Sequence, residues 1–134
     1  MFWNQKIYAA YGSNLNLEQM LKRTNATVIC EDEIEGYELE FSGPLNVVSA
    51  KNKSIKVGLY SVGFFDRLAL DRYEQKYKRI NVKTKSGKDV SMYVMKEKRN
   101  RKSPSPQYFN VVMEGYKNWN FDTKPLIEAK TKSS

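Results

Sequence analysis

Hydrophobic and polar residues alternate along much of the chain between residues 37 and 94. A period of two is typical of strands with one buried face, and runs of β-branched and aromatic residues favour the same structure. Together the two signals predict short strands at residues 6–11, 37–41, 45–50, 55–59, 80–84 and 90–94. The Ser86-Gly87 pair between the last two predicts a hairpin turn.

A second spacing, with apolar residues three or four positions apart, predicts three helices. The first begins after a potential N-cap at Asn16 and carries apolar residues as far as Thr24. The second covers residues 64–73, in which Phe65, Ala69 and Tyr73 are spaced four positions apart. The third begins at Ser105-Pro106, a capping residue followed by a proline suited to a first turn, and ends at or soon after Gly115.

These elements indicate an α+β fold. Most of the strands follow one another without an intervening helix, which favours a small mixed or antiparallel sheet, curled into a β-barrel with flanking helices, over a doubly wound sheet. The length suits a single domain over residues 1–134. We expect the last segment, about 124–134, to be a loosely ordered tail, because its lysines show no clear pattern.

Composition excludes several kinds of chemistry. The chain of 134 residues has no histidine and one cysteine, Cys30. Ser-His-Asp and Cys-His catalysis are therefore excluded, together with a disulfide within the chain and histidine or multi-cysteine metal sites. We expect no metal and no cofactor, and we interpret Cys30 as a small core residue. Carboxylates, lysines, hydroxyls and backbone amides are left to carry any catalysis.

Three motifs hold residues suited to a site. Residues 11–15 (Tyr-Gly-Ser-Asn-Leu) lie between a strand and a helix, where exposed backbone amides can hold an anion. Residues 70–74 end the middle helix with Glu74, a carboxylate placed against the helix dipole. Residues 103–108 open the last helix and include Tyr108. Taken singly, each motif has a plain structural interpretation: an ordinary turn, a surface ion pair and a helix cap.

The order of the three motifs is more specific than any one of them. Tyr-Gly-Ser-Asn-Leu, then Leu-Asp-x-Tyr-Glu, then Pro-Ser-x-x-Tyr resembles the gamma-glutamylcyclotransferase-like family, which includes the AIG2-like proteins. The resemblance extends from about Tyr8 to about Phe121. Residues 36–41 and 57–60 are similar to two of the family's strands, and Gly115 falls at a glycine of its last helix.

The resemblance implies a fold, a reaction and a set of site residues. Family members fold as a small mixed barrel, and the known activity converts a gamma-glutamyl amide into 5-oxoproline and a free amine without a metal or cofactor. Glu74 falls on the catalytic glutamate, which acts as general acid and base. The substrate-binding residues implied are Tyr11, Gly12, Ser13, Asn14, Leu15 and Tyr108.

Other functions stay open at this point. A protein of the same fold could bind a small ligand without turnover, as a sponge or inhibitor. The net charge of +8 invites a nucleic-acid partner, but the aromatic RNA-binding motif is missing and the basic residues are spread widely. The densest basic run, Lys96–Lys102, leads directly into the third motif, so we expect it near the rim of the site.

Partner and location follow from the same observations. The expected partner is a small gamma-glutamyl compound, and a homodimer is left open. No apolar run is long enough to cross a membrane and no signal peptide is evident, so we expect a cytoplasmic protein.

Overall fold

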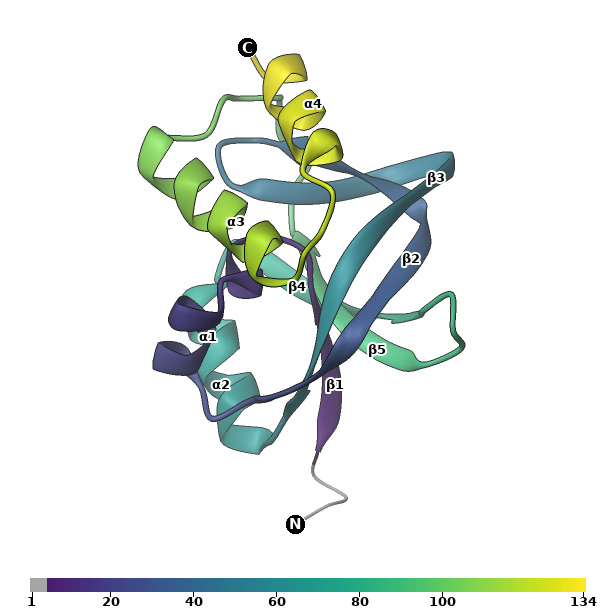
Figure 1. Ribbon diagram of the computed structural model, residues 1–134, viewed down its shortest axis with the longest axis vertical. Helices are drawn as coiled ribbons and strands as arrows, with labels where there is room; N and C mark the ends of the chain where they lie inside the picture. The colour runs from purple at the N-terminus through teal and green to yellow at the C-terminus, as the bar shows by residue number, and fades with distance from the viewer. Residues whose placement is uncertain (1–4) are drawn as a thin grey trace.

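The computed structural model describes residues 5–134, in which one mixed sheet is flanked by helices (Figure 1). The strands are β1 (Lys6–Ala10), β2 (Thr27–Phe41), β3 (Leu45–Val62), β4 (Tyr77–Lys83) and β5 (Asp89–Met95). The helices are the 3₁₀ turn η2 (Ser13–Leu15), α1 (Leu17–Arg23), α2 (Phe64–Tyr73), α3 (Pro106–Asn118) and α4 (Lys124–Lys132). The α+β class predicted from the sequence is confirmed.

The sheet is curled but not closed, so the expected barrel is only partly formed. Its order is β2-β3-β1-β5-β4, with β2 and β4 at the two edges. β1 runs antiparallel to β3 and parallel to β5, which it meets at Tyr8 and Ser91. The turn after β4 reaches the opposite edge, where the Lys85 N–H donates to the carbonyl of Glu33 on β2 at 2.8 Å. The two edges approach each other there without forming a ladder within residues 5–134.

β2 and β3 form a long hairpin rather than the several short strands that were expected. The turn lies at residues 42–44, between the strands predicted at 37–41 and 45–50, and Gly43 has the positive φ of +81° that favours glycine. The segments predicted at 45–50 and 55–59 are parts of the single strand β3. The pairing shifts register at Gly36, where Glu35 pairs with Ser54 and Tyr37 with Ser49. This bulge lets the hairpin bend between the two segments, 45–50 and 55–59, that were predicted as separate strands.

The first and third predicted helices begin at the expected caps. The Asn16 side chain accepts from the Gln19 N–H at 3.1 Å, and the Ser105 side chain accepts from the Tyr108 N–H at 3.2 Å. α3 approaches the start of α1 very closely at Gly115. A Cβ atom added at this position would lie only 2.6 Å from the backbone nitrogen of Asn16. Glycine is thus what allows the contact.

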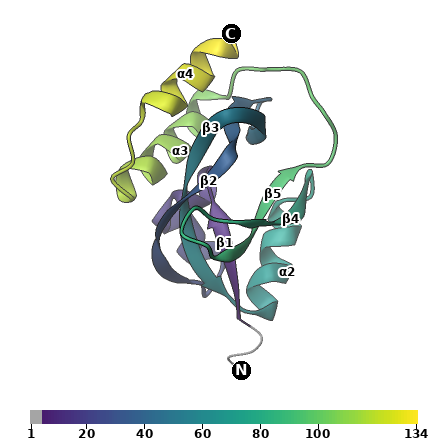
Figure 2. The same ribbon diagram turned by 90° about the vertical axis from the view of Figure 1, so that its right-hand side faces the viewer.

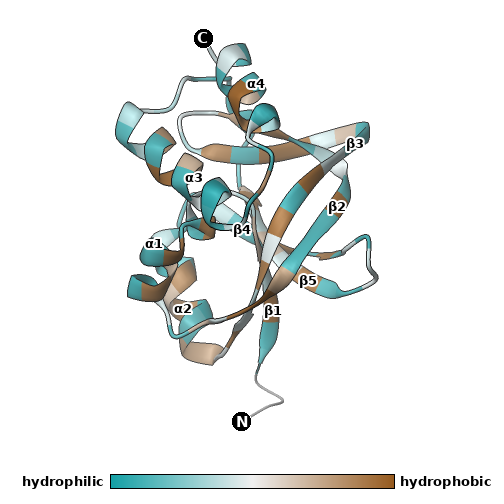
Figure 3. Cartoon of the chain, in the orientation of Figure 1, coloured by the Kyte–Doolittle hydropathy of each residue, from teal (hydrophilic) through white to brown (hydrophobic). Residues whose placement is uncertain are grey.

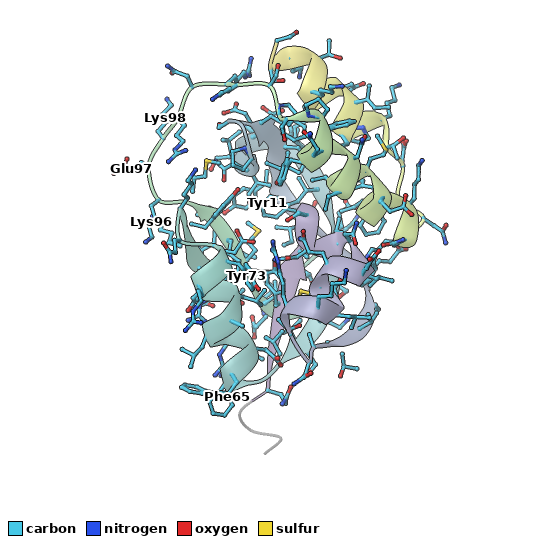
Figure 4. All side chains as sticks on the ribbon, turned by 90° about the vertical axis from the view of Figure 1, so that its left-hand side faces the viewer. Tyr11, Phe65, Tyr73, Lys96, Glu97 and Lys98 are labelled. Carbon is cyan, nitrogen blue, oxygen red and sulfur yellow. The ribbon has the colours of Figure 1, made fainter. Side chains whose placement is uncertain are left out.

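α2 lies where it was predicted, but the residues whose spacing predicted it do not face the core. Leu70 is the one fully buried residue of this helix. Phe65 is 80% exposed and Tyr73 is 56% exposed. Figure 4 shows Phe65 at the outer end of α2 and Tyr73 near the middle of the molecule.

The expected loose tail after residue 124 was wrong, because this segment is the helix α4. Leu126 and Ala129 are buried, and the helix packs against β2. Figure 3 shows hydrophobic positions on α4 among hydrophilic ones. Two buried side chains among several lysines make a weak hydrophobic pattern, so this helix could not be predicted from periodicity. Within the described residues, no helix is both long and apolar enough to cross a membrane.

The loop between β5 and α3 arches over the outside of the molecule (Figure 2). It contains the basic run Lys96–Lys102. Its last part touches the β2–β3 turn, where the Gly43 N–H donates to the Lys102 carbonyl and the Lys102 N–H donates to the Phe41 carbonyl. The loop therefore starts and ends on the sheet and is exposed between the two points.

Candidate active site

The 11–15 loop is fixed by aromatic donors that hold its carbonyl groups. The Tyr116 hydroxyl donates to the Tyr11 carbonyl at 3.0 Å, and the Tyr60 hydroxyl donates to the Asn14 carbonyl at 2.7 Å. The Trp119 indole N–H donates to the Leu15 carbonyl at 2.9 Å. These donors come from β3 and from the α3 region, so the loop is held by elements far away in the sequence.

The amide side of the same loop is the side available to a ligand. None of the hydrogen bonds formed among residues 5–134 uses the N–H groups of Gly12, Ser13 or Asn14. These three residues line a cavity of about 550 Å³. Consecutive unpartnered amides ahead of a helix are suited to hold an anion such as a carboxylate.

Glu74 lies across this cavity at the C-terminal end of α2. Its N–H donates to the Leu70 carbonyl at 2.8 Å, and its own carbonyl accepts from the Tyr77 N–H at 3.0 Å. The backbone on both sides of the residue is thereby fixed. One turn earlier, Asp71 accepts from the Tyr93 hydroxyl at 2.6 Å and from Arg79 at 3.1 Å, which ties α2 to β5 and β4.

The Glu74 carboxyl is largely buried, with 16% of its side chain exposed. Burial raises the pKa of this carboxyl above its usual value, while Arg23 and the hydrogen bond from Asn14 act in the opposite direction. The Asn14 side-chain amide donates to Glu74 Oε1 at 3.2 Å and to the Tyr8 hydroxyl at 3.0 Å. Because its pKa is raised, this carboxyl is better suited than an exposed glutamate to take up and return a proton.

Tyrosines make up much of the remaining wall of the cavity: Tyr8, Tyr11, Tyr73, Tyr77, Tyr93 and Tyr108. The Tyr108 hydroxyl accepts from the Leu45 N–H at 3.0 Å, and burial raises the pKa of Tyr108 to about 12. Its phenol is therefore protonated at neutral pH and can donate a hydrogen bond towards a ligand.

The cavity also has a cationic rim. Arg23, Arg72 and Lys76 line it. Burial raises the pKa of Tyr77, and Arg99, a member of the basic run, is a weaker influence that lowers it. Figure 4 shows the Lys96–Lys98 part of the loop arching outward at one edge of the molecule, with Tyr11 and Tyr73 nearer its middle.

The structure brings most of the predicted site residues together. Gly12, Ser13, Asn14, Glu74 and Tyr108 line the one cavity. Tyr11 lines it too, but its hydroxyl donates to the Tyr93 carbonyl at 2.7 Å, so this group serves the fold.

Leu15 does not line the cavity. It is fully buried beneath the loop. The roles assigned to these residues from the family resemblance stay predictions.

Sequence reasoning missed Arg23, which lies against Glu74 and Tyr73. It is the last residue of α1, a position where a basic residue is common for reasons of helix stability alone. Within residues 5–134 the structure contains no cluster of three or more His, Cys, Asp or Glu side chains that could hold a metal.

The fold and the cavity together define a protein with a mixed sheet and an acidic residue facing a backbone amide cradle. Residues 8–117 match the family described as gamma-glutamyl cyclotransferase, AIG2-like, and the chain belongs to this family. No curated protein sequence matches the chain.

Solved structures share the fold at low sequence identity. A gamma-glutamyl cyclotransferase superposes with a TM-score of 0.76 at 22% identity, over 95% of this chain and 85% of that one. An uncharacterized protein from Homo sapiens gives 0.79 at 20% identity, over 95% and 87%. YkqA from Bacillus subtilis gives 0.80 at 15% identity, over 97% and 54%. At these identities the likeness concerns the fold alone.

Proposed function

We propose that the protein is a gamma-glutamyl cyclotransferase, which cleaves a gamma-glutamyl amide to 5-oxoproline and a free amine. The observation that carries the proposal is the position of Glu74, a largely buried carboxyl that shares one cavity with the amides of Gly12, Ser13 and Asn14, which have no hydrogen-bond acceptor among residues 5–134. Family membership supports the same reaction.

The reaction needs no nucleophile from the protein. The α-amine of the glutamyl group attacks its own γ-carbonyl carbon, forming the ring C–N bond, and the bond to the leaving nitrogen breaks. In our proposal Glu74 accepts the proton from the attacking amine and returns it to the leaving nitrogen, so one carboxyl acts as base and then as acid. The substrate's atoms are fully divided between 5-oxoproline and the amine, and no water is consumed.

The loop amides and Tyr108 fit the remaining requirements. The N–H groups of Gly12, Ser13 and Asn14 would bind the substrate's α-carboxylate and hold the chain folded for ring closure, an effect that can be worth several kcal/mol. The Tyr108 hydroxyl can donate to the γ-carbonyl oxygen as negative charge develops there. Burial of the carboxyl supports proton transfer, because it brings the pKa closer to the working pH.

The test is release of 5-oxoproline from a panel of gamma-glutamyl amides by wild type and by Glu74→Gln. We expect turnover to fall by at least about 10²-fold in Glu74→Gln, the usual scale for loss of a general acid-base group. Glu114→Gln, on the exposed side of α3, is the matched control and should keep its activity. If no compound is turned over but a ligand raises the wild-type melting temperature, a function limited to binding replaces this proposal.

A further inference from the structure

Arg23 occupies a defined place beside Glu74 rather than a solvated one. Only 23% of its side chain is exposed. Its guanidinium carbon lies 4.2 Å from the centre of the Tyr73 ring, a cation–π contact that holds the group against the ring. Its Nη1 atom lies 3.0 Å from Asn14 Oδ1 and 3.9 Å from Glu74 Oε1. Three side chains, one from η2 and two from the C-terminal end of α2, thus meet around one guanidinium.

The contact with Asn14 determines which end of that amide faces Glu74. A guanidinium has donors only, so the group of Asn14 that faces Arg23 must be the oxygen. The same oxygen also accepts from Gln19 at 3.3 Å. The NH₂ group is then turned the other way, where it donates to Glu74 Oε1 and to the Tyr8 hydroxyl. Arg23 therefore keeps a donor, and not an acceptor, pointed at the carboxylate.

The distance between Arg23 and Glu74 has its own consequence. A close two-pronged arginine pair would occupy both carboxylate oxygens and would lower the pKa of the carboxyl by about 1–3 units. At 3.9 Å the guanidinium supplies its charge without a hydrogen bond to either oxygen. Among residues 5–134 no hydrogen bond uses Glu74 Oε2, so this oxygen is available to exchange a proton with a substrate.

The other groups around Glu74 do not supply this charge in the same way. The side chains that line the cavity with Glu74 from β1, the 11–15 loop, β4, β5 and α3 include the tyrosines Tyr8, Tyr11, Tyr77, Tyr93 and Tyr108. Arg72 and Lys76 line the cavity from its own segment. Among these charged groups, Arg23 is the one that opposes the effect of burial on the pKa of Glu74.

We propose that Arg23 is a positioning residue for the proton shuttle: through Asn14 and its own charge it holds Glu74 ionised, with Oε2 directed to the substrate. This inference rests on the proposed function of Glu74. The competing role for Arg23 is direct binding of the substrate's carboxylate. If Arg23 binds the substrate directly, its substitution should raise KM and leave the pKa of Glu74 unchanged.

The deciding measurement is the pKa of Glu74 in the ligand-free protein, followed by carboxyl ¹³C NMR and assigned with Glu74→Gln. In Arg23→Gln we expect this pKa to rise by about one unit or more, with a smaller rise in Arg23→Lys, which keeps the charge. Lys22→Gln is the matched control, since its cation is on the same helix but pairs with exposed Glu18. An unchanged pKa in Arg23→Gln would overturn the inference whether or not the protein turns anything over.

Kinetics give a second, separate readout. In Arg23→Gln the acid limb of kcat/KM should move to higher pH by the same amount as the NMR pKa. At its optimum kcat should fall roughly 10-fold or more, since misplacing a catalytic group can cost about 10²-fold. A rise in KM alone would overturn the inference in favour of substrate binding.

If Arg23→Gln does not fold, Tyr73→Leu replaces it. This substitution removes the ring that holds the guanidinium, at a residue already 56% exposed, and should also raise the pKa of Glu74. An unchanged pKa in that variant would count against the inference. Absence of turnover in every protein, with the pKa shifts as expected, would instead remove the proposed reaction and leave the positioning role.

Discussion

The hydroxyl of Tyr60 on β3 donates a buried 2.7 Å hydrogen bond to the carbonyl of Asn14, the residue whose side chain contacts Glu74. In Tyr60→Phe this carbonyl loses its donor, and we expect the free energy of unfolding to fall by about 1–3 kcal/mol. Urea unfolding monitored by fluorescence measures the change. Tyr37→Phe is the control, because the half-buried Tyr37 hydroxyl makes no hydrogen bond among residues 5–134. Equal losses in the two variants would contradict this account.

Gly115→Ala should destabilise the protein although alanine normally favours a helix by about 1 kcal/mol over glycine. The new methyl group would lie 2.6 Å from the Asn16 nitrogen and 2.9 Å from the Leu15 carbonyl carbon, and backbone atoms cannot yield as a flexible side chain can. We expect a net loss of about 1–3 kcal/mol, measured by urea unfolding. A gain in stability would mean that α3 can move away from the 11–15 loop at little cost.

Gly12→Ala provides the opposite case. Its methyl group would meet only ordinary contacts, 3.7 Å from Leu45 and 3.8 Å from the Tyr108 hydroxyl, so stability should change little. The methyl would, however, take up space in the cavity that a ligand needs. We expect ligand affinity to fall by about 5- to 150-fold, the equivalent of about 1–3 kcal/mol of overpacking. Calorimetric titration with a non-hydrolysed gamma-glutamyl analogue measures it, and unchanged affinity would exclude the loop amides from binding.

Glu74 should make the protein less stable as the pH rises. Its folded-state pKa is raised, chiefly by burial, so the folded protein binds the proton more tightly than the unfolded chain does. The resulting stabilisation is fully present below the unfolded value near 4.5 and is lost as the pH rises through the folded value. The Glu74→Gln variant has no carboxyl to ionise at this position, so its stability should not fall in this way. Melting temperatures of the two proteins should therefore agree more closely near pH 4 than at pH 7, where the variant should be the more stable; parallel curves would contradict this.

Within the basic run, Arg99 should matter more to the site than Arg101. The charge of Arg99 lowers the pKa of Tyr77, a residue of the cavity wall, whereas Arg101 pairs with Glu40 at 3.3 Å. If the amine portion of the substrate is anionic, Arg99→Gln should raise its KM and flatten the dependence of kcat/KM on salt. Arg101→Gln is the matched control. Initial rates at low and high ionic strength test this, and identical kinetics in all three proteins would make the run a solvated connector.

The sequence predicted the caps and the hairpin turn because these depend on local chemistry. Asn16 and Ser105 cap their helices through their own side chains, and Gly87 takes the positive φ expected of its turn. The convergence of Gly12, Glu74 and Tyr108 followed from motif order and family resemblance. The predicted strands and helices alone would not have placed these three residues together.

What was missed depends on tertiary contacts. α4 owes its helical state to Leu126 and Ala129 packing against β2, and no local signal marks that partner. Leu15 was assigned to binding because it belongs to a motif, yet its side chain is buried under the loop. Arg23 looked like an ordinary basic residue at a helix end, and only the folded chain shows which carboxylate it faces.

The way the 11–15 loop is held also determines how it can move. Its carbonyls are bound by Tyr60, Tyr116 and Trp119, and the last two lie more than 100 positions away in the chain. The loop cannot detach without separating α3 and β3 from it, so fraying of a single turn is not enough to expose it. In hydrogen exchange, the Leu15 and Asn16 amides, which donate back to Gly12 and Ser13, should therefore exchange only through opening of the whole domain. The loop forms a single cooperative unit with the strand and helix that hold it.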